Sequence, residues 1–279
     1  MDPLLAAHEA AATADSTEAA AFADFFDAAP KPVRMALGLR VERVADATLF
    51  IAPGYNNSLL NRAIGLGTQR EAQTSDVDAI TNIYQAAGSP IWTLHWNPFA
   101  RPSHLLPELH ARGFVQARQP ASVKMMRAAY PAPSVQTDLR VQVAASGQID
   151  DVARVFTEAF VLPPVMGDWL RALGDRPGWT VYAATDGDAV VGCGCRHQVG
   201  ESAWLGMGAV HGSHRRRGGQ GALMALRIAD AVAAGARRIF IETGKPGTGE
   251  SSPSLNNMKR CGFVPVATRL NLNGPVLQR

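Results

Sequence analysis

A short pattern occurs once in each half of the chain, at the end of one expected helix and directly before an expected strand. Residues 110–114 read His-Ala-Arg-Gly-Phe and residues 259–263 read Lys-Arg-Cys-Gly-Phe, so an arginine stands shortly before Gly-Phe in both. Helices and strands follow one another in a similar order around the two copies. With 279 residues, enough for about two domains, the chain is expected to fold as two similar α/β domains in tandem.

Composition excludes several classes of protein. Hydrophobic residues make up 47% of the chain and charged residues 18%, which excludes wholesale disorder. No apolar run approaches the ~18–20 residues of a membrane span, and the first residues lack the basic start of a secretory signal. The three cysteines, Cys193, Cys195 and Cys261, are too few for a disulfide framework or a four-cysteine zinc site. A cytoplasmic protein without membrane or metal sites is therefore expected, and a net charge of +3 is weak evidence for a nucleic-acid partner.

The first half begins with an alanine-rich extension, residues 1–30. A helix is expected over residues 16–29, with Phe22, Phe25 and Phe26 on one face, and it ends before Pro30. A docking helix and a partly ordered tail are equally compatible with this composition. The first domain is expected at residues 31–130. Its strands are expected at 39–44, 48–52, 60–66, 91–94 and 122–127, and its helices at 75–87 and 103–112.

A proline-rich segment at residues 131–137 reads as a linker, and the second domain is expected at residues 138–279. Within it, Ser252 has the side chain of an N-cap, Pro253 suits the first helical position and Gly262 stands just past the helix end. Strands are expected at 139–143, 180–184, 189–195, 204–210, 238–242 and 264–272, and helices at 149–160, 221–234 and 252–261.

The segment that carries most chemical information, residues 210–223, joins a strand to a helix. Three arginines, Arg215, Arg216 and Arg217, precede a helix N-terminus whose dipole is already positive. Glycines around them leave backbone N–H groups free to converge on an anion such as a phosphate. This combination favours an anion site over the alternative, a solvated basic loop.

Two common phosphate-binding patterns do not fit. The segment 244–251 has the spacing of a Walker loop, but Glu250 stands where the phosphate-binding lysine belongs, and a carboxylate there would repel phosphate. A dinucleotide-binding fold would need a longer glycine pattern than Gly65-Leu66-Gly67. An NTPase and a dinucleotide-binding enzyme are both rejected.

The pattern Arg-x-x-Gly-x-Gly at a strand–helix junction, followed by a strand, a short helix, Gly-Phe and a strand, resembles the GNAT superfamily of acyl-CoA N-acyltransferases. The resemblance covers residues 139–272, while residues 33–128 resemble a degenerate copy without the arginine–glycine loop. It implies an α/β fold of two tandem GNAT-like domains, each a mixed, mostly antiparallel sheet flanked by helices. The acyl-CoA site would belong to the second domain.

The motif can be aligned in two registers. One takes Arg216, Gly219 and Gly221, whereas the other takes Arg215 and Gly218, with Gln220 in place of the second small residue. The second register is preferred because it keeps the flanking strand and helix in phase. In either, the resemblance implies that the loop binds the pyrophosphate of coenzyme A or acetyl-CoA. The residues that it places at the coenzyme are Ala209, Val210, His211, Arg215, Arg216, Arg217, Gly218, Gly219, Gln220, Gly221, Ala222, Ser251, Ser254 and Asn257.

One position departs from the family pattern. GNAT enzymes often carry a tyrosine four residues before the glycine of Gly-Phe, where it protonates the leaving thiolate, and here that residue is Met258. The asparagine that often precedes it is Ser251 by the same count. A coenzyme A thiolate can leave without a proton, so the reaction is not excluded, but the proton donor has no obvious candidate.

Acyl transfer to an amine needs a base, because a protonated amine is not a nucleophile. Glu242, at the end of the strand 238–242, is the first candidate, acting through a water, and an exposed strand-end carboxylate is the alternative reading. His211 and His214 are weaker candidates. The resemblance implies that the backbone of Ala209 and Val210 bonds the pantetheine arm and that Val210 stabilises the oxyanion. The cysteines read as small buried residues.

An aromatic cluster in the first domain has two readings. The cluster comprises Trp92, His95, Trp96 and Phe99. These residues could line the acceptor pocket across the domain interface. They could instead belong to the core, and this second reading is favoured because large aromatic residues are usually buried in cores.

The sequence therefore predicts an acetyl-CoA-dependent N-acetyltransferase that acts on a small-molecule amine by direct attack on the thioester, as a monomer or homodimer. The first alternative is a non-catalytic acyl-CoA-binding regulatory protein, which Met258 suggests. A weaker alternative is a nucleic-acid-binding module that uses the arginine run.

Overall fold

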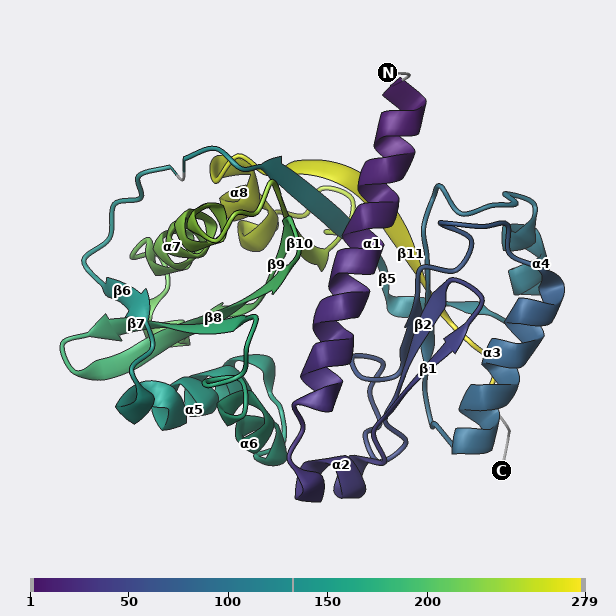
Figure 1. Ribbon diagram of the computed structural model, residues 1–279, viewed down its shortest axis with the longest axis horizontal. Coiled ribbons are helices and arrows are strands. Elements are labelled where there is room, and N and C mark those ends of the chain that lie inside the picture. The colour runs from purple at the N-terminus through teal and green to yellow at the C-terminus, as the bar shows by residue number, and fades with distance from the viewer. Residues whose placement is uncertain (1–2, 132, 277–279) are drawn as a thin grey trace.

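The computed structural model describes residues 3–131 and 133–276, and within them one continuous sheet of eleven strands forms the centre of the molecule (Figure 1). Its strand order is β1-β2-β3-β4-β11-β5-β10-β9-β8-β7-β6. The first half contributes β1 (Arg40–Val44), β2 (Ala47–Ile51), β3 (Arg62–Ile64), β4 (Thr93–Trp96) and β5 (Val115–Ala128). The second half contributes β6 (Arg140–Val143), β7 (Trp179–Asp186), β8 (Ala189–Val199), β9 (Ser202–Val210), β10 (Arg238–Gly244) and β11 (Val264–Asn273).

The two halves repeat one plan. The pairs β3–β4 and β9–β10 are parallel, and every other pair of neighbours in the described sheet is antiparallel. A long helix connects the parallel strands in each half, α3 (Thr74–Ala87) in the first and α7 (Gly219–Ala233) in the second. A mixed, mostly antiparallel α/β fold was expected from the sequence and is confirmed.

The last strand of each half is exchanged with the other half. β5 lies between β10 and β11, and β11 lies between β4 and β5, so each terminal strand completes the opposite half of the sheet. This exchange joins the halves through continuous backbone hydrogen bonds, which a chain of two separately closed sheets would lack.

Helices cover both faces of the sheet (Figure 1). Leu49 and Ile51 pack with Val77 and Ile80 of α3 on one face, while Phe50 between them packs with α1 (Pro3–Asp27) on the other, as the period of two along a strand requires. The face with α1 also carries α2 (Lys31–Leu37), α5 (Ile149–Phe160) and α6 (Val165–Arg171). The opposite face carries α3, α4 (Leu105–Ala111), α7 and α8 (Pro253–Arg260).

Within the described ranges, none of these helices combines the length and apolar character needed to cross a bilayer.

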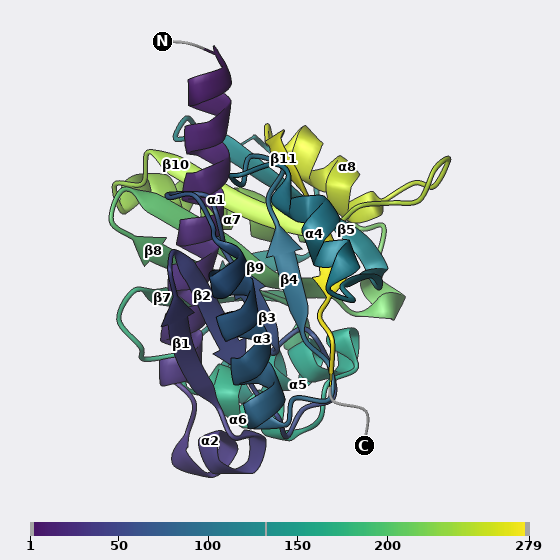
Figure 2. The same ribbon diagram turned by 90° about the vertical axis from the view of Figure 1, so that its right-hand side faces the viewer.

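The N-terminal segment is a docked helix. α1 has 25 residues, longer than the expected helix, and it runs across the middle of the sheet with its first turns beyond the rest of the molecule (Figures 1 and 2). It contacts strands of both halves, including β3, β5, β9 and β11. Phe22, Phe25 and Phe26 are buried. The alternative of a partly ordered tail is wrong for the described part of this helix, because its aromatic face is buried against the sheet.

α1 also carries charge into the interior. Arg269 on β11 is fully buried and donates hydrogen bonds to Asp15 and Glu18 of α1, at 3.0 and 2.8 Å, and to Glu242 of β10 at 2.8 Å. Lys124 of β5 donates to both Glu18 and Glu242. The buried charge network comprises Asp15, Glu18, Arg62, Lys124, Glu242 and Arg269, so three cations balance three carboxylates.

Glu18 is the centre of this network. Burial raises the pKa of its carboxyl, but the charges of Arg269, Lys124 and Arg62 outweigh burial and hold the pKa well below the usual 4.5. Burial and the same cations lower the pKa of nearby His95 well below its usual range, so His95 is neutral at neutral pH. Breaking one member of such a buried network is costly because it leaves uncompensated charge in a low dielectric.

Glu18→Gln is expected to lower the free energy of unfolding at pH 7 by about 3–5 kcal/mol, measured by denaturant titration. Because the pKa of Glu18 is depressed in the folded state, its contribution is present above pH 4.5 and is lost as the pH falls through the folded-state pKa. The difference between wild type and variant should therefore shrink in acid. Glu9→Gln, on the exposed side of the same helix, is the matched control. Equal stability of wild type and Glu18→Gln at pH 7 would contradict this account.

Candidate functional site

The parallel strands β9 and β10 separate in the middle of the sheet. They pair from Ser202 and Arg238 only as far as Leu205 and Ile241. Beyond this point β9 stays with β8 and β10 stays with β5. A bulge in β9 accompanies the separation, with Met207 at φ 55° and a shift of register against β8. The separation leaves an opening between the two strands.

The arginine–glycine loop lies at the end of β9. Gly218 caps α7 in the left-handed conformation, at φ 78°, and a Cβ there would lie 2.1 Å from the carbonyl oxygen of Gln136. Only glycine fits both the angle and the contact. Gly219 is similarly tight against Leu139, where a Cβ would approach to 2.7 Å. The segment 133–137 thus packs directly on the loop.

The loop presents groups that bind anions. The first helical hydrogen bond of α7 runs from the Ala222 amide to the Gly218 carbonyl, so the amides of Gly219, Gln220 and Gly221 have no acceptor within the helix. Arg215 and Arg216 are exposed beside them. Amides and guanidinium groups that converge at a helix N-terminus suit a phosphate or pyrophosphate.

A groove of about 1160 Å³ runs from this loop between α7 and α8. It is lined by the following residues of the expected coenzyme set: Ala209, Val210, Arg215, Arg216, Gly218, Gly219, Gln220, Gly221, Ser254 and Asn257. A hydrogen bond crosses it, because Asn257 Nδ2 donates to Gln220 Oε1 at 2.7 Å. Gln220, which replaces the usual small residue, therefore contacts the opposite helix.

The other residues of the expected coenzyme set lie off the groove. Arg217 forms ion pairs with Asp138 and Asp186, both at 2.6 Å. His211 Nδ1 lies 2.7 Å from Ser213 Oγ. Ala222 is buried under the loop, and Ser251 precedes the N-cap of α8. The structure thus brings ten of the fourteen residues together, and the remaining four are His211, Arg217, Ala222 and Ser251.

α8 begins as expected from the sequence. Ser252 Oγ accepts a hydrogen bond from the Leu255 amide at 3.2 Å, Pro253 follows at the first turn, and Gly262 adopts φ 81° after the helix. Met258 is buried on the face of α8 toward the sheet and lines a second space that adjoins the groove.

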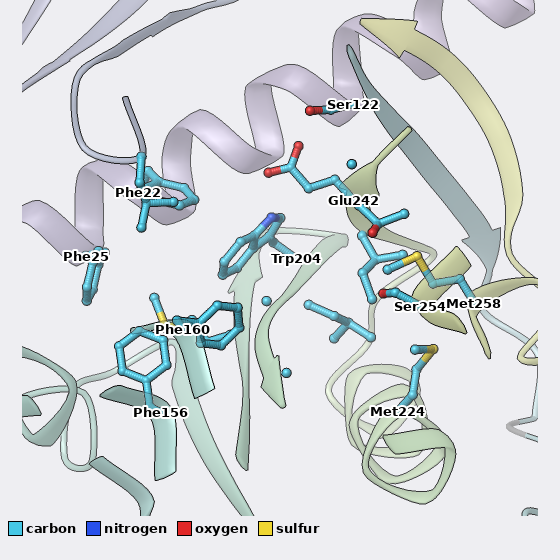
Figure 3. A pocket seen from close by; sticks show the side chains of 18 of the residues that line it. Phe22, Phe25, Ser122, Phe156, Phe160, Trp204, Met224, Glu242, Ser254 and Met258 are labelled. Atoms are coloured by element: carbon cyan, nitrogen blue, oxygen red, sulfur yellow. The ribbon is translucent and has the colours of Figure 1, made fainter. Parts of the chain in front are cut away.

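This second space is a cavity of about 390 Å³. The groove and the cavity meet at the point where β9 leaves β10. They share four lining residues there, Phe160, Gly208, Gln220 and Ser254. Figure 3 shows aromatic rings along one side and Ser254, Met258 and Met224 along the other, with Trp204 between them. The aromatic side comprises Phe22 and Phe25 of α1 and Phe156 and Phe160 of α5.

Glu242 supplies the carboxylate of the cavity (Figure 3). Its Oε2 accepts from Arg269 and Lys124 at 2.8 and 3.3 Å, whereas Oε1 has a longer contact of 3.8 Å with Arg62. The side chain is 20% exposed. The sequence left open an exposed strand-end carboxylate or a base in the cleft. The structure places Glu242 in the cavity and joins it to the buried charge network, so the exposed alternative does not apply.

Arg227 on α7 was not among the site residues predicted from the sequence. It is 1% exposed, and its guanidinium donates to the backbone carbonyls of Leu223, Cys195 and Gly206. Burial lowers the pKa of this arginine. Gly194 and Gly208 make room for it, since a Cβ at either would lie 3.0 Å from the guanidinium. The one available signal was the repeated glycine in both strands, which indicates close approach of another group.

Cys193, Cys195 and the two tryptophans of the first-half aromatic cluster, Trp92 and Trp96, are core residues. Cys193 and Cys195 are buried, and burial raises the pKa of the Cys193 thiol to about 12, which makes it a poor nucleophile. Trp92 stacks on Tyr84 under α3, and Trp96 belongs to the same cluster. The interpretation of these tryptophans as walls of the acceptor pocket is therefore wrong.

In the described residues no group of histidine, cysteine and acidic side chains could hold a metal ion.

Comparisons with known proteins agree with this geometry. Residues 149–263 match the model of the acetyltransferase (GNAT) family. No curated protein matches the chain in sequence. Among solved structures, a GCN5-related N-acetyltransferase from Kribbella flavida is similar, with 15% identity over 86% of this chain and 92% of its own, and a TM-score of 0.63.

Two further structures have the same fold. A GCN5-related N-acetyltransferase from Sphaerobacter thermophilus is 14% identical over 84% of this chain and 82% of its own, with a TM-score of 0.60. A tandem GNAT protein from the clavulanic acid biosynthesis pathway is 15% identical over 82% of this chain and 79% of its own, with a TM-score of 0.55. Residues 149–263 therefore match the acetyltransferase (GNAT) family, and the fold of the chain is that of a tandem GNAT protein.

Proposed function

We propose that this protein is an acetyl-CoA-dependent N-acetyltransferase that acts on a small-molecule amine. The observation that carries the proposal is the junction of the groove with the cavity at the opening between β9 and β10. A donor bound along the groove would bring its thioester to Gly208 and Ser254, where the cavity begins. An acceptor in the cavity would meet it there.

The groove suits coenzyme A in size and chemistry. The free amides of α7, together with Arg215 and Arg216, complement a pyrophosphate. Gly218 is held against Gln136 so closely that a side chain at this position would displace the loop. The backbone of Ala209 and Val210 is the proposed partner of the pantetheine arm, and Val210 the proposed donor to the oxyanion.

The cavity suits the acceptor amine. Oε1 of Glu242 is the freer carboxylate oxygen, since Arg269 and Lys124 both bond to Oε2. Glu242 is the proposed base, which takes the amine proton directly or through a water as the nitrogen attacks the thioester. Acetyl-CoA supplies the activated acyl group. The enclosed carboxylate beside the groove favours an enzyme over a protein that only binds acyl-CoA.

Arg215→Ala is expected to weaken acetyl-CoA binding by about tenfold or more, because one charge-assisted contact to phosphate is worth about 1.5–3 kcal/mol. Isothermal titration calorimetry measures the change. Arg237→Ala is the matched control, since Arg237 is exposed and pairs only with surface Glu201. Absence of acetyl-CoA binding by the wild type would overturn the proposed function.

Glu242→Gln is expected to lower kcat/KM for the amine by about 10²–10⁴-fold, the usual contribution of a general base, while the Kd for acetyl-CoA stays unchanged. Steady-state release of free thiol measures the rate, and thermal unfolding shows whether the buried charge network survives. Glu201→Gln, an exposed carboxylate, is the control. Full activity of the Glu242→Gln enzyme would remove Glu242 from the proposed mechanism.

A further inference from the structure

The walls of the acceptor cavity differ sharply in polarity from one end to the other. The four phenylalanines of α1 and α5 gather at one end, whereas Glu242 and Ser122 lie together at another (Figure 3). The lining of the cavity also includes the apolar side chains of Leu59, Leu162 and Met166. Arg62 also borders the cavity, but its charge is already engaged. Its Cζ lies 3.8 Å from the centroid of the Phe22 ring, and its Nη1 lies 3.3 Å from Oε1 of Glu18.

Part of the exposed rim of the cavity is apolar as well. Leu59 is 37% exposed and Phe160 is 44% exposed, although both are large hydrophobic side chains. Leu59 belongs to the loop between β2 and β3, and Phe160 ends α5, so the rim is built from both halves of the chain. Exposed apolar side chains around a cavity are typical of a binding site for an apolar ligand.

From this distribution we infer that the acceptor is a primary amine on an aromatic or branched hydrocarbon body. The inference rests on the proposed function and specifies its substrate class. The amine would lie near Oε1 of Glu242 and face the groove, while the hydrocarbon body would lie among Phe22, Phe25 and Phe156. A polyhydroxylated amine would leave its hydroxyl groups without partners against these rings, which is unfavourable.

Calorimetry on protein saturated with coenzyme A tests the substrate class, with 2-phenylethylamine and glucosamine as probes. The expected result is binding of 2-phenylethylamine at least about tenfold tighter, since one methylene in an apolar pocket is already worth roughly 10–200-fold. Leu59→Asn should weaken this binding and leave glucosamine unchanged. Met35→Asn, at an exposed position away from the cavity, is the control.

Equal affinity for the two amines, or tighter binding of glucosamine, would overturn the inferred substrate class. Failure of the proposed function looks different, because it appears as absent acetyl-CoA binding or absent acetylated product. The binding measurement does not need turnover, so the two outcomes stay separate.

A different observation, a buried cation without a carboxylate partner, concerns the leaving group. Arg227 donates only to backbone carbonyls, and in the described part of the chain it forms no ion pair with a carboxylate. Other titratable groups that face it are Tyr182, Cys193, Cys195 and Cys261. Burial raises the pKa of all four, so each is neutral at pH 7 and none offsets the charge of Arg227.

The position of this cation coincides with the junction of groove and cavity. Gln220, Met224 and Arg227 lie on one face of α7 and all border the cavity. The guanidinium reaches Gly208, where a Cβ would lie 3.0 Å from Nη2, and Gly208 borders the groove as well. Met258, at the usual place of a proton-donating tyrosine, lines the same cavity.

We propose that Arg227 stabilises the thiolate that leaves during acyl transfer, in place of a proton donor. The amine nitrogen bonds to the carbonyl carbon, the carbon–sulfur bond breaks, and its electron pair remains on sulfur. The proton lost by the amine goes to Glu242 or to solvent. A fixed cation in a water-poor site lowers the energy of a developing anion without any proton transfer. This second proposal also rests on the proposed function.

The pKa of the coenzyme A thiol, measured in the complex by the ultraviolet absorbance of the thiolate, tests the role of Arg227. An adjacent cation lowers such a pKa by about 1–3 units, so the bound thiol should titrate at least about one unit below free coenzyme A. Arg227→Lys should keep most of this shift and Arg227→Met should lose it. Leu226→Met, at the neighbouring helical position, is the control for packing.

Two results would overturn the role of Arg227. One is a bound thiol that titrates like free coenzyme A in the wild type, which needs no variant and is independent of whether Arg227→Met folds. The other is an equal shift in Arg227→Lys and Arg227→Met. Failure of coenzyme A to bind at all would instead count against the proposed function.

Discussion

The ion pairs between Arg269 and three carboxylates hold the molecule together at its centre. Arg269 comes from the last strand, Asp15 and Glu18 from the first helix, and Glu242 from the strand that borders the cavity. Burying Arg269 without these carboxylates would leave uncompensated charge at the centre of the molecule, which is costly, so the docking of α1, the insertion of β11 and the position of Glu242 depend on one another. The candidate base is thus fixed by contacts made far from it in sequence.

The sequence predicts structure correctly where the signal is local. Ser252 caps the helix that follows it, Pro253 stands in its first turn, and Gly262 adopts φ 81° after its end. These signals lie within a few consecutive residues, and they are found as expected. The strand expected at 48–52 is also found, as β2, and its apolar side chains face the two layers in turn, because the period of a strand does not depend on its neighbours.

The parts that the sequence did not reveal are set by partners distant along the chain. β11 lies between β4 and β5, and nothing within residues 264–273 distinguishes this pairing from one inside the second half. Asp15 and Glu18 look like exposed residues of an alanine-rich helix until Arg269 and Lys124 are placed beside them. Arg227 likewise looks like an ordinary surface residue of α7, and only the glycines of β8 and β9 show where its side chain fits.

The groove, the opening between β9 and β10, and the cavity divide the proposed reaction among elements of both halves. The second half supplies the arginine–glycine loop and the opening, while α1 from the first half supplies aromatic walls and part of the charge network. In the proposed reaction, the first half would thus take part in acceptor binding, although it lacks an arginine–glycine loop of its own.

The most direct test of this account is a reaction of the purified protein with acetyl-CoA and 2-phenylethylamine, followed by mass spectrometry of the amine and titration of free thiol. The account predicts acetylated amine and free coenzyme A in equal amounts, both dependent on the amine and on the protein. Acetyl-CoA that binds at the groove but yields neither product, with this amine or with a broad panel of others, would contradict the assignment as an acetyltransferase.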